Sequence, residues 1–206
     1  MKLILSKENS ISGTMIAYLK LMRVKEWIKN LFIFIPLFFS GEIFSSNKFV
    51  ELLFGFLAFG LVASSIYIIN DYRDVESDRK HPVKCLRPIA AGIISGSTAI
   101  IVCVLCALSG LLIAFQLKLM FFILVLGYFI LNLSYSFGLK NISILDINII
   151  AIGFVIRIKC GGVLAEVGIS SWLTIMVYCL PYFLRSPKGV MIFILNNHQV
   201  WICVKQ

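Results

Sequence analysis

The chain has 206 residues, of which 60% are hydrophobic and only 14% are charged. Soluble domains are close to half apolar and a quarter charged, so the composition excludes a water-soluble globule and requires a lipid bilayer around much of the surface. The formal net charge is +9, which we interpret as membrane topology and contact with anionic lipids, with no nucleic acid as a partner.

Six apolar stretches are candidates for membrane-spanning helices, since about 20 apolar residues cross a bilayer. An amphipathic lead over Tyr18–Asn30 enters the first of them, and the last is short. In chain order they are Leu31–Ser40, Phe49–Ile69, Ser97–Leu117, Leu119–Phe137, Ile144–Val163 and Trp172–Leu184. Long apolar runs without alternation favour helices over strands. The sequence therefore predicts an all-α integral membrane protein.

The basic residues predict how these helices are oriented. The start, Met1–Thr14, is polar and lacks the features of a cleavable signal peptide, so we expect the first membrane helix to direct insertion. Opposite loops offer Lys48 and Lys118 only. The other side carries Lys2, Lys7, Lys20, Arg23, Lys25, Lys29, Arg73, Arg79, Lys80, Lys84, Arg87 and Lys140. This asymmetry predicts a multi-pass protein of the cell (inner) membrane whose N-terminus and polar loops are cytoplasmic.

The polar loop after the second helix concentrates acidic residues. If that helix continues through the loop, Asn70, Asp74 and Asp78 step by four, and Asp71 falls on the same arc of about 100°. Carboxylates crowded on one face repel each other unless a cation lies among them, and hard oxygen ligands suit Mg²⁺. The alternative is a loop that is polar because it lies in water. The spacing and the basic residues that follow favour a Mg²⁺ site.

The pattern N-D-x-x-D-x-x-x-D, followed by D-R-x-H-P-x-K-x-x-R-P-I-A, closely resembles the first aspartate-rich motif of the UbiA prenyltransferase superfamily. The resemblance extends from about Tyr18 to Trp172. It implies a UbiA-type transmembrane bundle, with about six helices present of about nine. It also implies that Asn70, Asp71, Asp74 and Asp78 bind Mg²⁺ and, through it, the diphosphate of a donor, with Asp74 and Asp78 serving catalysis.

A second motif, D-x-x-x-D, distinguishes branches of that family. Here it keeps Asp146 but has Ile150 four positions later. The chain looks more like the branch typified by decaprenyl-phosphate phosphoribosyltransferase, and the blocks that support this are Met22–Asn30, Asp78–Ala90 and Tyr135–Lys140. The implied reaction transfers a 5-phosphoribosyl group from phosphoribosyl diphosphate (PRPP) to a polyprenyl phosphate.

The resemblance also implies which other residues serve this reaction. Both substrates are anionic, so basic side chains are needed beside the metal. We expect Lys140 to be catalytic. The expected substrate-binding residues are Arg23, Asn30, Asn70, Lys84, Arg87, Tyr135 and Asp146.

Two groups of charged residues allow more than one interpretation. On an α-helix Arg23, Glu26, Trp27 and Asn30 share a face, which either anchors the helix at the lipid headgroups or lines the mouth of the site. Lys25 and Lys29 face the other way and are expected to be anchors. Arg157 and Lys159 lie inside the fifth helix, where a charge is usually functional. Arg157 is either a site residue or the partner of a carboxylate.

Several alternatives remain for the function. A prenyltransferase would move a prenyl group from a prenyl diphosphate to an aromatic or other acceptor. A small transporter or channel would carry polar residues along its helices, whereas here they cluster in loops. An inactive, truncated fragment is the third alternative. We expect residues 1–184 to form the transmembrane domain and 185–206 an atypical tail, translated out of frame. Polyprenyl length and oligomeric state are not assigned.

Overall fold

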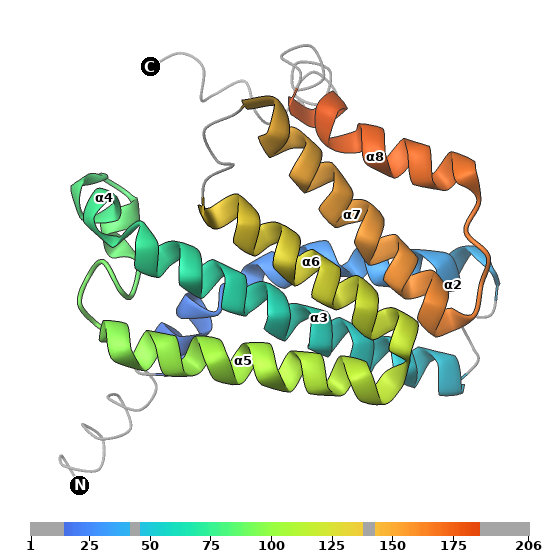
Figure 1. Ribbon diagram of the computed structural model, residues 1–206, viewed down its shortest axis with the longest axis horizontal. Helices are drawn as coiled ribbons and strands as arrows, with labels where there is room; N and C mark the ends of the chain where they lie inside the picture. The colour runs from blue at the N-terminus through green and yellow to red at the C-terminus, as the bar shows by residue number, and fades with distance from the viewer. Residues whose placement is uncertain (1–14, 42–45, 138–142, 186–206) are drawn as a thin grey trace, which may run out of the picture.

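The computed structural model describes residues 15–41, 46–137 and 143–185, and these ranges contain helices and no strand. Lys140 and residues 186–206 of the expected tail lie outside them. After a short helical stretch over residues 15–21 the elements are η1 (Val24–Phe34), α2 (Ile35–Phe39), α3 (Ser46–Arg73), α4 (Val75–Lys80), η2 (Lys84–Leu86), α5 (Gly96–Leu117), α6 (Leu119–Phe137), α7 (Ser143–Ala165) and α8 (Ser171–Arg185) (Figure 1). The predicted all-α bundle is confirmed.

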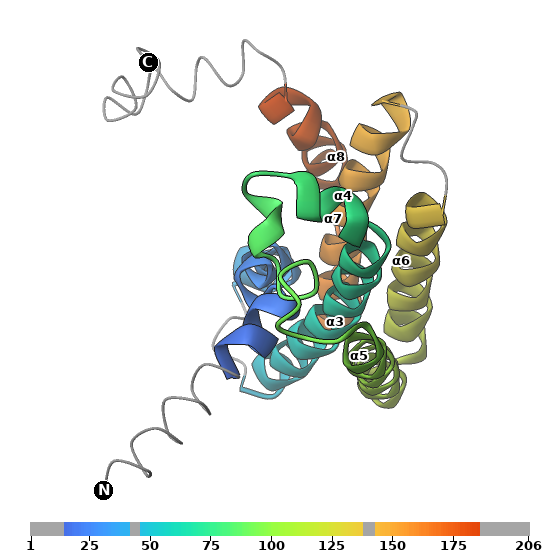
Figure 2. The same cartoon turned by 90° about the vertical axis from the view of Figure 1, so that its left-hand side faces the viewer.

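Helix α3 is the centre of the bundle. It contacts α5, α6, α7 and η1, and the end view in Figure 2 shows these elements arranged around it. Its side chains Phe59 and Val62 pack with Phe121 and Val125 of α6 and Leu164 of α7, all of them buried. The faces that point away from this core keep large apolar side chains exposed, as a bilayer allows.

Four helices are long and apolar enough to cross a membrane, over Asn47–Arg73, Gly96–Leu117, Leu119–Ser136 and Asp146–Ala165. They match the second to fifth expected spans, and α3 continues four residues beyond the expected Ile69. The helix over Ser171–Leu184 is shorter, as the sequence indicated for the sixth span.

The first expected helix is broken, which corrects the prediction of one amphipathic α-helix over Tyr18–Asn30 and beyond. The chain turns at Arg23, whose φ of 49° is left-handed, and then continues as the 3-10 helix η1. Tertiary hydrogen bonds hold the turn: Ser64 Oγ donates to Met22 O at 2.7 Å and accepts from Trp27 Nε1 at 3.0 Å. Pro36, at the start of α2, lies where the 3-10 helix changes to α.

A 3-10 helix is longer per residue than an α-helix. Eleven residues of η1 and five of α2 reach about 30 Å, at roughly 2.0 and 1.5 Å per residue, which equals the thickness of the hydrocarbon core. The segment Val24–Phe39 is therefore about as long as the hydrocarbon core is thick although it holds only 16 residues, and its charged residues Lys25, Glu26 and Lys29 are all in the first half.

Close backbone contacts hold this segment against α7. A Cβ placed on Gly161 would lie 2.0 Å from the carbonyl oxygen of Ile33, so only glycine allows the approach. Small residues serve the same purpose in other membrane bundles, where helices associate through close packing.

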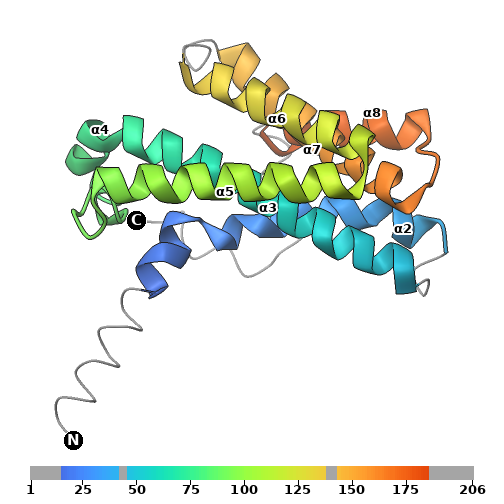
Figure 3. The ribbon, with the colours of Figure 1, turned by 60° about the horizontal axis from the view of Figure 1, so that its bottom comes forward.

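The two ends of the bundle differ in character. Figure 3 shows α4 and the start of α5 at one end, and α2 and the turn between α5 and α6 at the other. The first end carries the acidic motif and its basic neighbours, and α6 ends and α7 begins on the same side (Figure 1). The acidic motif, the end of α6 and the start of α7 therefore lie at the same end of the bundle.

Candidate active site

Two buried aspartates of the motif are bound by arginines. Asp71 and Asp78 are 3% and 2% exposed. Arg87 Nη1 donates to Asp71 Oδ1 at 3.0 Å and to Asp78 Oδ2 at 2.6 Å, and Arg23 Nη2 donates to Asp71 Oδ1 at 2.5 Å. The two negative and two positive charges balance, which is how buried carboxylates are tolerated.

Local backbone features bring the arginines to this cluster. Arg87 precedes Pro88 and is extended (φ −65°, ψ 141°), the conformation that a following proline imposes. The chain turns back after α4 and carries Arg87 over the end of α3. Arg23 reaches Asp71 from the left-handed turn before η1, and its guanidinium lies 5.2 Å from the centre of the Tyr67 ring.

The motif keeps its helical stepping through a short interruption. Helix α3 ends at Arg73, Asp74 leaves helical geometry (φ −88°, ψ 6°), and α4 begins at Val75. The amides of Asp74 and Asp78 still donate to the carbonyls of Asn70 and Asp74, at 2.9 and 2.8 Å. Asn70, Asp74 and Asp78 therefore follow one another at successive turns, as the sequence predicted for a continuous helix.

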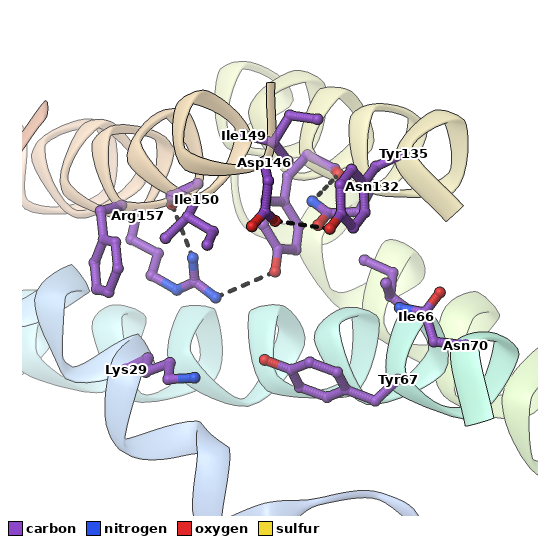
Figure 4. A pocket seen from close by; sticks show the side chains of 13 residues that line it. Lys29, Ile66, Tyr67, Asn70, Asn132, Tyr135, Asp146, Ile149, Ile150 and Arg157 are labelled. Carbon is purple, nitrogen blue, oxygen red and sulfur yellow. Dashed lines mark hydrogen bonds between the residues drawn. The ribbon is translucent and has the colours of Figure 1, made fainter. Parts of the chain in front are cut away.

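A cavity of about 360 Å³ lies next to this motif, between α3, α6, α7 and η1. Figure 4 shows polar side chains from four elements directed into it. The residues that line it are Lys29, Ile66, Tyr67, Asn70, Tyr128, Asn132, Tyr135, Asp146, Ile149, Ile150, Gly153, Phe154 and Arg157.

Oxygen-bearing side chains meet at the end of the cavity nearest the motif. Ser136 Oγ donates to Asn70 Oδ1 at 2.5 Å, and Tyr135 Oη donates to Asp146 Oδ1 at 2.7 Å. Arg73 also donates to the carbonyl oxygen of Ser136. These bonds link α3 to α6 and α6 to α7, so the three helices fix the positions of Asn70 and Asp146.

A buried guanidinium lies further along the cavity. Arg157 is 5% exposed. Its Nε donates to Asn30 Oδ1 at 2.9 Å, Nη1 to Gly153 O at 2.8 Å and Nη2 to Tyr128 Oη at 3.2 Å. The Arg157 side chain reaches the carbonyl of Gly153 because helical side chains point towards the preceding turn of their own helix, to which Gly153 belongs.

The expected site residues divide between the cluster and the cavity. Asn70, Tyr135 and Asp146 line the cavity, and Asn30 is joined to it through Arg157. Arg23 and Arg87 belong to the ion-pair cluster, Asp74 is half-buried at the end of α3, and Lys84 is exposed on η2.

Lys29 lines the cavity, whereas the sequence favoured a membrane anchor. In the 3-10 helix η1, residues three apart eclipse one another. Lys29 therefore stands beside Glu26, with Nζ 2.5 Å from Oε2, and not on the opposite face. Tyr67, Tyr128 and Asn132 were also missed. In the sequence, these three residues differ from their neighbours only in carrying a hydrogen-bonding group within an apolar stretch.

The donor groups at this end are of the type that Mg²⁺ prefers, namely carboxylate and amide oxygens. Within the described ranges, no three Asp, Glu, His or Cys side chains converge as a ready metal cage. Asp71 is already bound by two arginines and Asp78 by one, through its Oδ2. A bound Mg²⁺ usually takes few protein ligands and completes its shell with substrate phosphates and water. Asn70 and Asp74 at successive turns, with Asp78 one turn further, fit that kind of site.

Fold and site together define an intramembrane helical bundle with an acidic motif and a polar cavity at one end. A family model for the UbiA prenyltransferase family matches residues 31–198, and the chain belongs to this family. The structure superimposes on that of a UbiA homolog from Archaeoglobus fulgidus bound to GPP and Mg²⁺, with a TM-score of 0.71 at 21% identity over 88% of this chain and 65% of the other.

Curated relatives are more similar in sequence. A decaprenyl-phosphate phosphoribosyltransferase from Mycolicibacterium smegmatis is 38% identical over 185 residues, covering 88% of this chain and 57% of that protein. The uncharacterized protein y4nM of Sinorhizobium fredii is 40% identical over 156 residues, covering 76% of this chain and 30% of that protein. The chain thus spans from less than a third to just over half of the length of these relatives.

Proposed function

We propose that the chain belongs to a transferase that moves a 5-phosphoribosyl group from PRPP to a polyprenyl phosphate in a Mg²⁺-dependent reaction. One observation carries the choice of donor. Asp146 and Ile150, one turn apart on α7, both line the cavity. The position where a second carboxylate would face the cavity is therefore apolar. A site built for two metals on a prenyl diphosphate would lack a ligand there. The similarity to phosphoribosyltransferases points the same way.

The reaction is a substitution at the anomeric carbon. An oxygen of the lipid phosphate forms a new bond to the anomeric carbon. At the same time the bond between this carbon and the diphosphate breaks, and the electron pair of the broken bond leaves with the diphosphate. The lipid phosphate is already ionised near neutral pH, so positioning and electrostatic stabilisation supply most of the catalysis. Asn70 and Asp74, with Asp78 beside Arg87, would hold Mg²⁺, which would supply positive charge to the departing diphosphate. Asp71, bound by Arg23 and Arg87, would position this motif.

The membrane orientation belongs to the same proposal. Lys and Arg residues gather in the N-terminal segment and in the loops at the acidic end, and the opposite loops offer Lys48 and Lys118. By the positive-inside rule the acidic end faces the cytoplasm of the inner membrane. The water-soluble donor would enter there, and the lipid acceptor would arrive from the bilayer.

Transfer of label tests the proposal. Membranes that contain the chain receive Mg²⁺, a polyprenyl phosphate and PRPP labelled in the ribose, and label that enters the lipid phase is counted. Asp74→Asn should abolish transfer. Glu76→Gln is the matched control, because Glu76 is an exposed carboxylate of the same segment that pairs with Arg79, and it should keep full activity.

Other outcomes discriminate between the alternatives. A prenyltransferase is the second candidate, because solved relatives hold GPP or DMAPP with Mg²⁺. Transfer from a labelled prenyl diphosphate to an aromatic acceptor, with none from PRPP, would establish it and overturn our choice of donor. No transfer by this chain, with transfer by a version extended to the length of its relatives, would show that further residues are needed.

A further inference from the structure

Arg157 is a buried cation inside a membrane-spanning helix, and no carboxylate of the described residues pairs with it. Its acceptors are an amide oxygen, a backbone carbonyl and a phenol. Three aromatic rings surround the guanidinium, with centroids 4.7 Å (Phe59), 5.0 Å (Tyr128) and 5.7 Å (Phe154) away. An arginine keeps its charge under all such conditions, so these contacts leave a net positive charge in a region of low dielectric.

The two arginines of the ion-pair cluster at the acidic motif differ from Arg157 in both pairing and exposure. Arg23 and Arg87 both bind buried aspartates at 3.0 Å or less. They are also more accessible, with side chains 27% and 26% exposed. A buried charge that has no counter-charge is strongly unfavourable, because its lost hydration is not replaced. Among the arginines whose side chains the structure describes, Arg157 is the most deeply buried and has no carboxylate partner. An anionic ligand from outside the protein would supply the missing counter-charge.

The cavity offers room for that partner. Arg157 lines it together with Lys29 of η1, and Figure 4 shows both side chains directed into the space that Tyr67 also enters. Beside them Asn30 Nδ2 is buried and has no hydrogen-bond partner among the described residues. A buried donor of this kind is rare and usually marks a missing acceptor. Two cations therefore line this part of the cavity. Lys29 is paired with Glu26 at 2.5 Å, whereas Arg157 has no carboxylate partner among the described residues. The unused donor belongs to Asn30, which contacts Arg157 but does not itself line the cavity.

We propose that Arg157, held in place by Asn30 and with Lys29 on the same cavity wall, binds a phosphate monoester separately from the diphosphate held at the acidic motif. This inference rests on the proposed function and names a second anion subsite within the same cavity. The phosphate is either the 5-phosphate of the donor or the head group of the lipid acceptor, since both carry the same charged group. A planar guanidinium with donors to spare suits phosphate better than it suits any uncharged ligand.

The spacing of the two subsites agrees with one bound molecule or two adjoining ones. Asp146 marks the oxygen-rich end, and Gly153, whose carbonyl accepts from Arg157, lies seven residues further along α7. Seven residues of α-helix correspond to about 10 Å. A sugar with a diphosphate at one end and a phosphate at the other is of this length. So is a diphosphate donor with a lipid phosphate behind its anomeric carbon.

Equilibrium binding to the purified chain in lipid nanodiscs tests this subsite without turnover. The probes are PRPP, farnesyl phosphate as a short lipid phosphate, farnesol as its uncharged counterpart, and pyrophosphate with Mg²⁺ for the acidic end. The variant is Arg157→Gln, with folding checked by its thermal unfolding. Loss of a charged hydrogen-bonding partner should weaken binding by tenfold or more. Farnesol and pyrophosphate should bind as they do to the parent chain.

The pattern of losses identifies the source of the phosphate. Weaker PRPP binding with unchanged farnesyl phosphate assigns Arg157 to the 5-phosphate, and the reverse assigns it to the lipid head group. A parent chain that ignores PRPP but binds farnesyl phosphate through Arg157 would remove our choice of donor and keep the subsite. Parent-like binding of both phosphates by folded Arg157→Gln would overturn the subsite.

Arg157→Lys covers the case in which the glutamine variant does not fold. Lysine keeps the positive charge but loses the planar arrangement of donors, so the affected phosphate should bind at least threefold more weakly. Lys29→Met is the companion variant, because Lys29 is 47% exposed and is not needed for the core. If both variants bind both phosphates as the parent does, the inference is wrong.

Discussion

Arg23 donates to Asp71 at 2.5 Å, and the two residues are 48 positions apart in the sequence. The contact joins the N-terminal segment to the cytoplasm-facing end of α3 in the proposed orientation. Arg23 adopts a left-handed backbone with φ of 49°, a conformation that costs a non-glycine residue about 1 kcal/mol or more. The ion pair to a buried carboxylate offsets this strain, so the turn before η1 and the acidic motif stabilise each other.

Asp71→Asn should destabilise the folded chain. The substitution leaves the guanidinium groups of Arg23 and Arg87 without one of their counter-charges, and breaking a largely buried pair costs about 3 kcal/mol. Unfolding of the purified protein in detergent, followed by circular dichroism against denaturant, measures the change. Glu76→Gln removes an exposed pair with Arg79 and should change the free energy of unfolding by less than about 0.5 kcal/mol. Equal effects would contradict a structural role for Asp71.

The sequence predicts the helices better than it predicts the site. Spans such as Leu119–Phe137 follow from apolar length alone, because a helix in lipid must satisfy its own backbone. The partners of the acidic motif depend instead on where the chain turns. The left-handed turn at Arg23 and the 3-10 geometry that carries Lys29 into the cavity are held by contacts to Ser64 and Asp71. Such contacts exist only once α3 is packed, so no local pattern reveals them.

For the acidic motif too, the sequence predicts the local geometry but not the tertiary partners. Its spacing correctly predicts that Asn70, Asp74 and Asp78 occupy successive turns. The spacing does not predict that Asp71 and Asp78 would be bridged by Arg87 from beyond α4. Whether Mg²⁺ binds to the motif stays a prediction.

Tyr135 and Asp146 provide a test of the cavity as the place of reaction. Asp146→Asn removes a charge at the oxygen-rich end and should lower transfer by tenfold or more. Tyr135→Phe removes the hydroxyl that donates to Asp146 at 2.7 Å, a bond to a charged group whose loss is worth about 1.5 kcal/mol or roughly tenfold. The initial rate of label transfer measures both. Tyr182→Phe is the control, since this hydroxyl bonds Asn148 outside the cavity lining. Full activity of Asp146→Asn would exclude the cavity as the site.

Gly161 should tolerate no side chain. A Cβ there would lie 2.0 Å from Ile33 O, so Gly161→Ala must separate η1 from α7, at about 3 kcal/mol for an overpacked contact. Gly127, in the middle of α6, has nothing within 4 Å of the corresponding position. Gly127→Ala should therefore be neutral or stabilising by about 0.5 kcal/mol, because alanine favours the helix. Thermal unfolding of the two variants compares them directly. A destabilised Gly127→Ala with an unaffected Gly161→Ala would contradict the packing described for η1.

Lys118 and Glu166 should give the stability a dependence on acidic pH. Lys118 Nζ donates to Glu166 Oε1 at 2.7 Å and also to the carbonyls of Val163 and Leu164 at the end of α7. Hydrogen bonding and the positive charge of Lys118 lower the pKa of the Glu166 carboxyl. A carboxyl with a lowered pKa in the folded state stabilises the fold above its unfolded pKa, and this contribution is lost as the pH falls through the folded pKa.

Thermal unfolding measured from neutral pH down to about pH 3 tests that coupling, because model carboxyls titrate near 4. The parent chain should lose stability across this range, and Glu166→Gln should lose less because its side chain cannot be protonated there. Raised salt should shrink the difference between the two, since the Glu166 carboxylate is exposed and screened by ions. Glu76→Gln, which leaves the contact of Lys118 untouched, should retain the acid loss of the parent. If Glu166→Gln and the parent respond to acid alike, Lys118 does not act through Glu166, and its other contacts, the two backbone carbonyls and Glu51 at 3.6 Å, hold it in place.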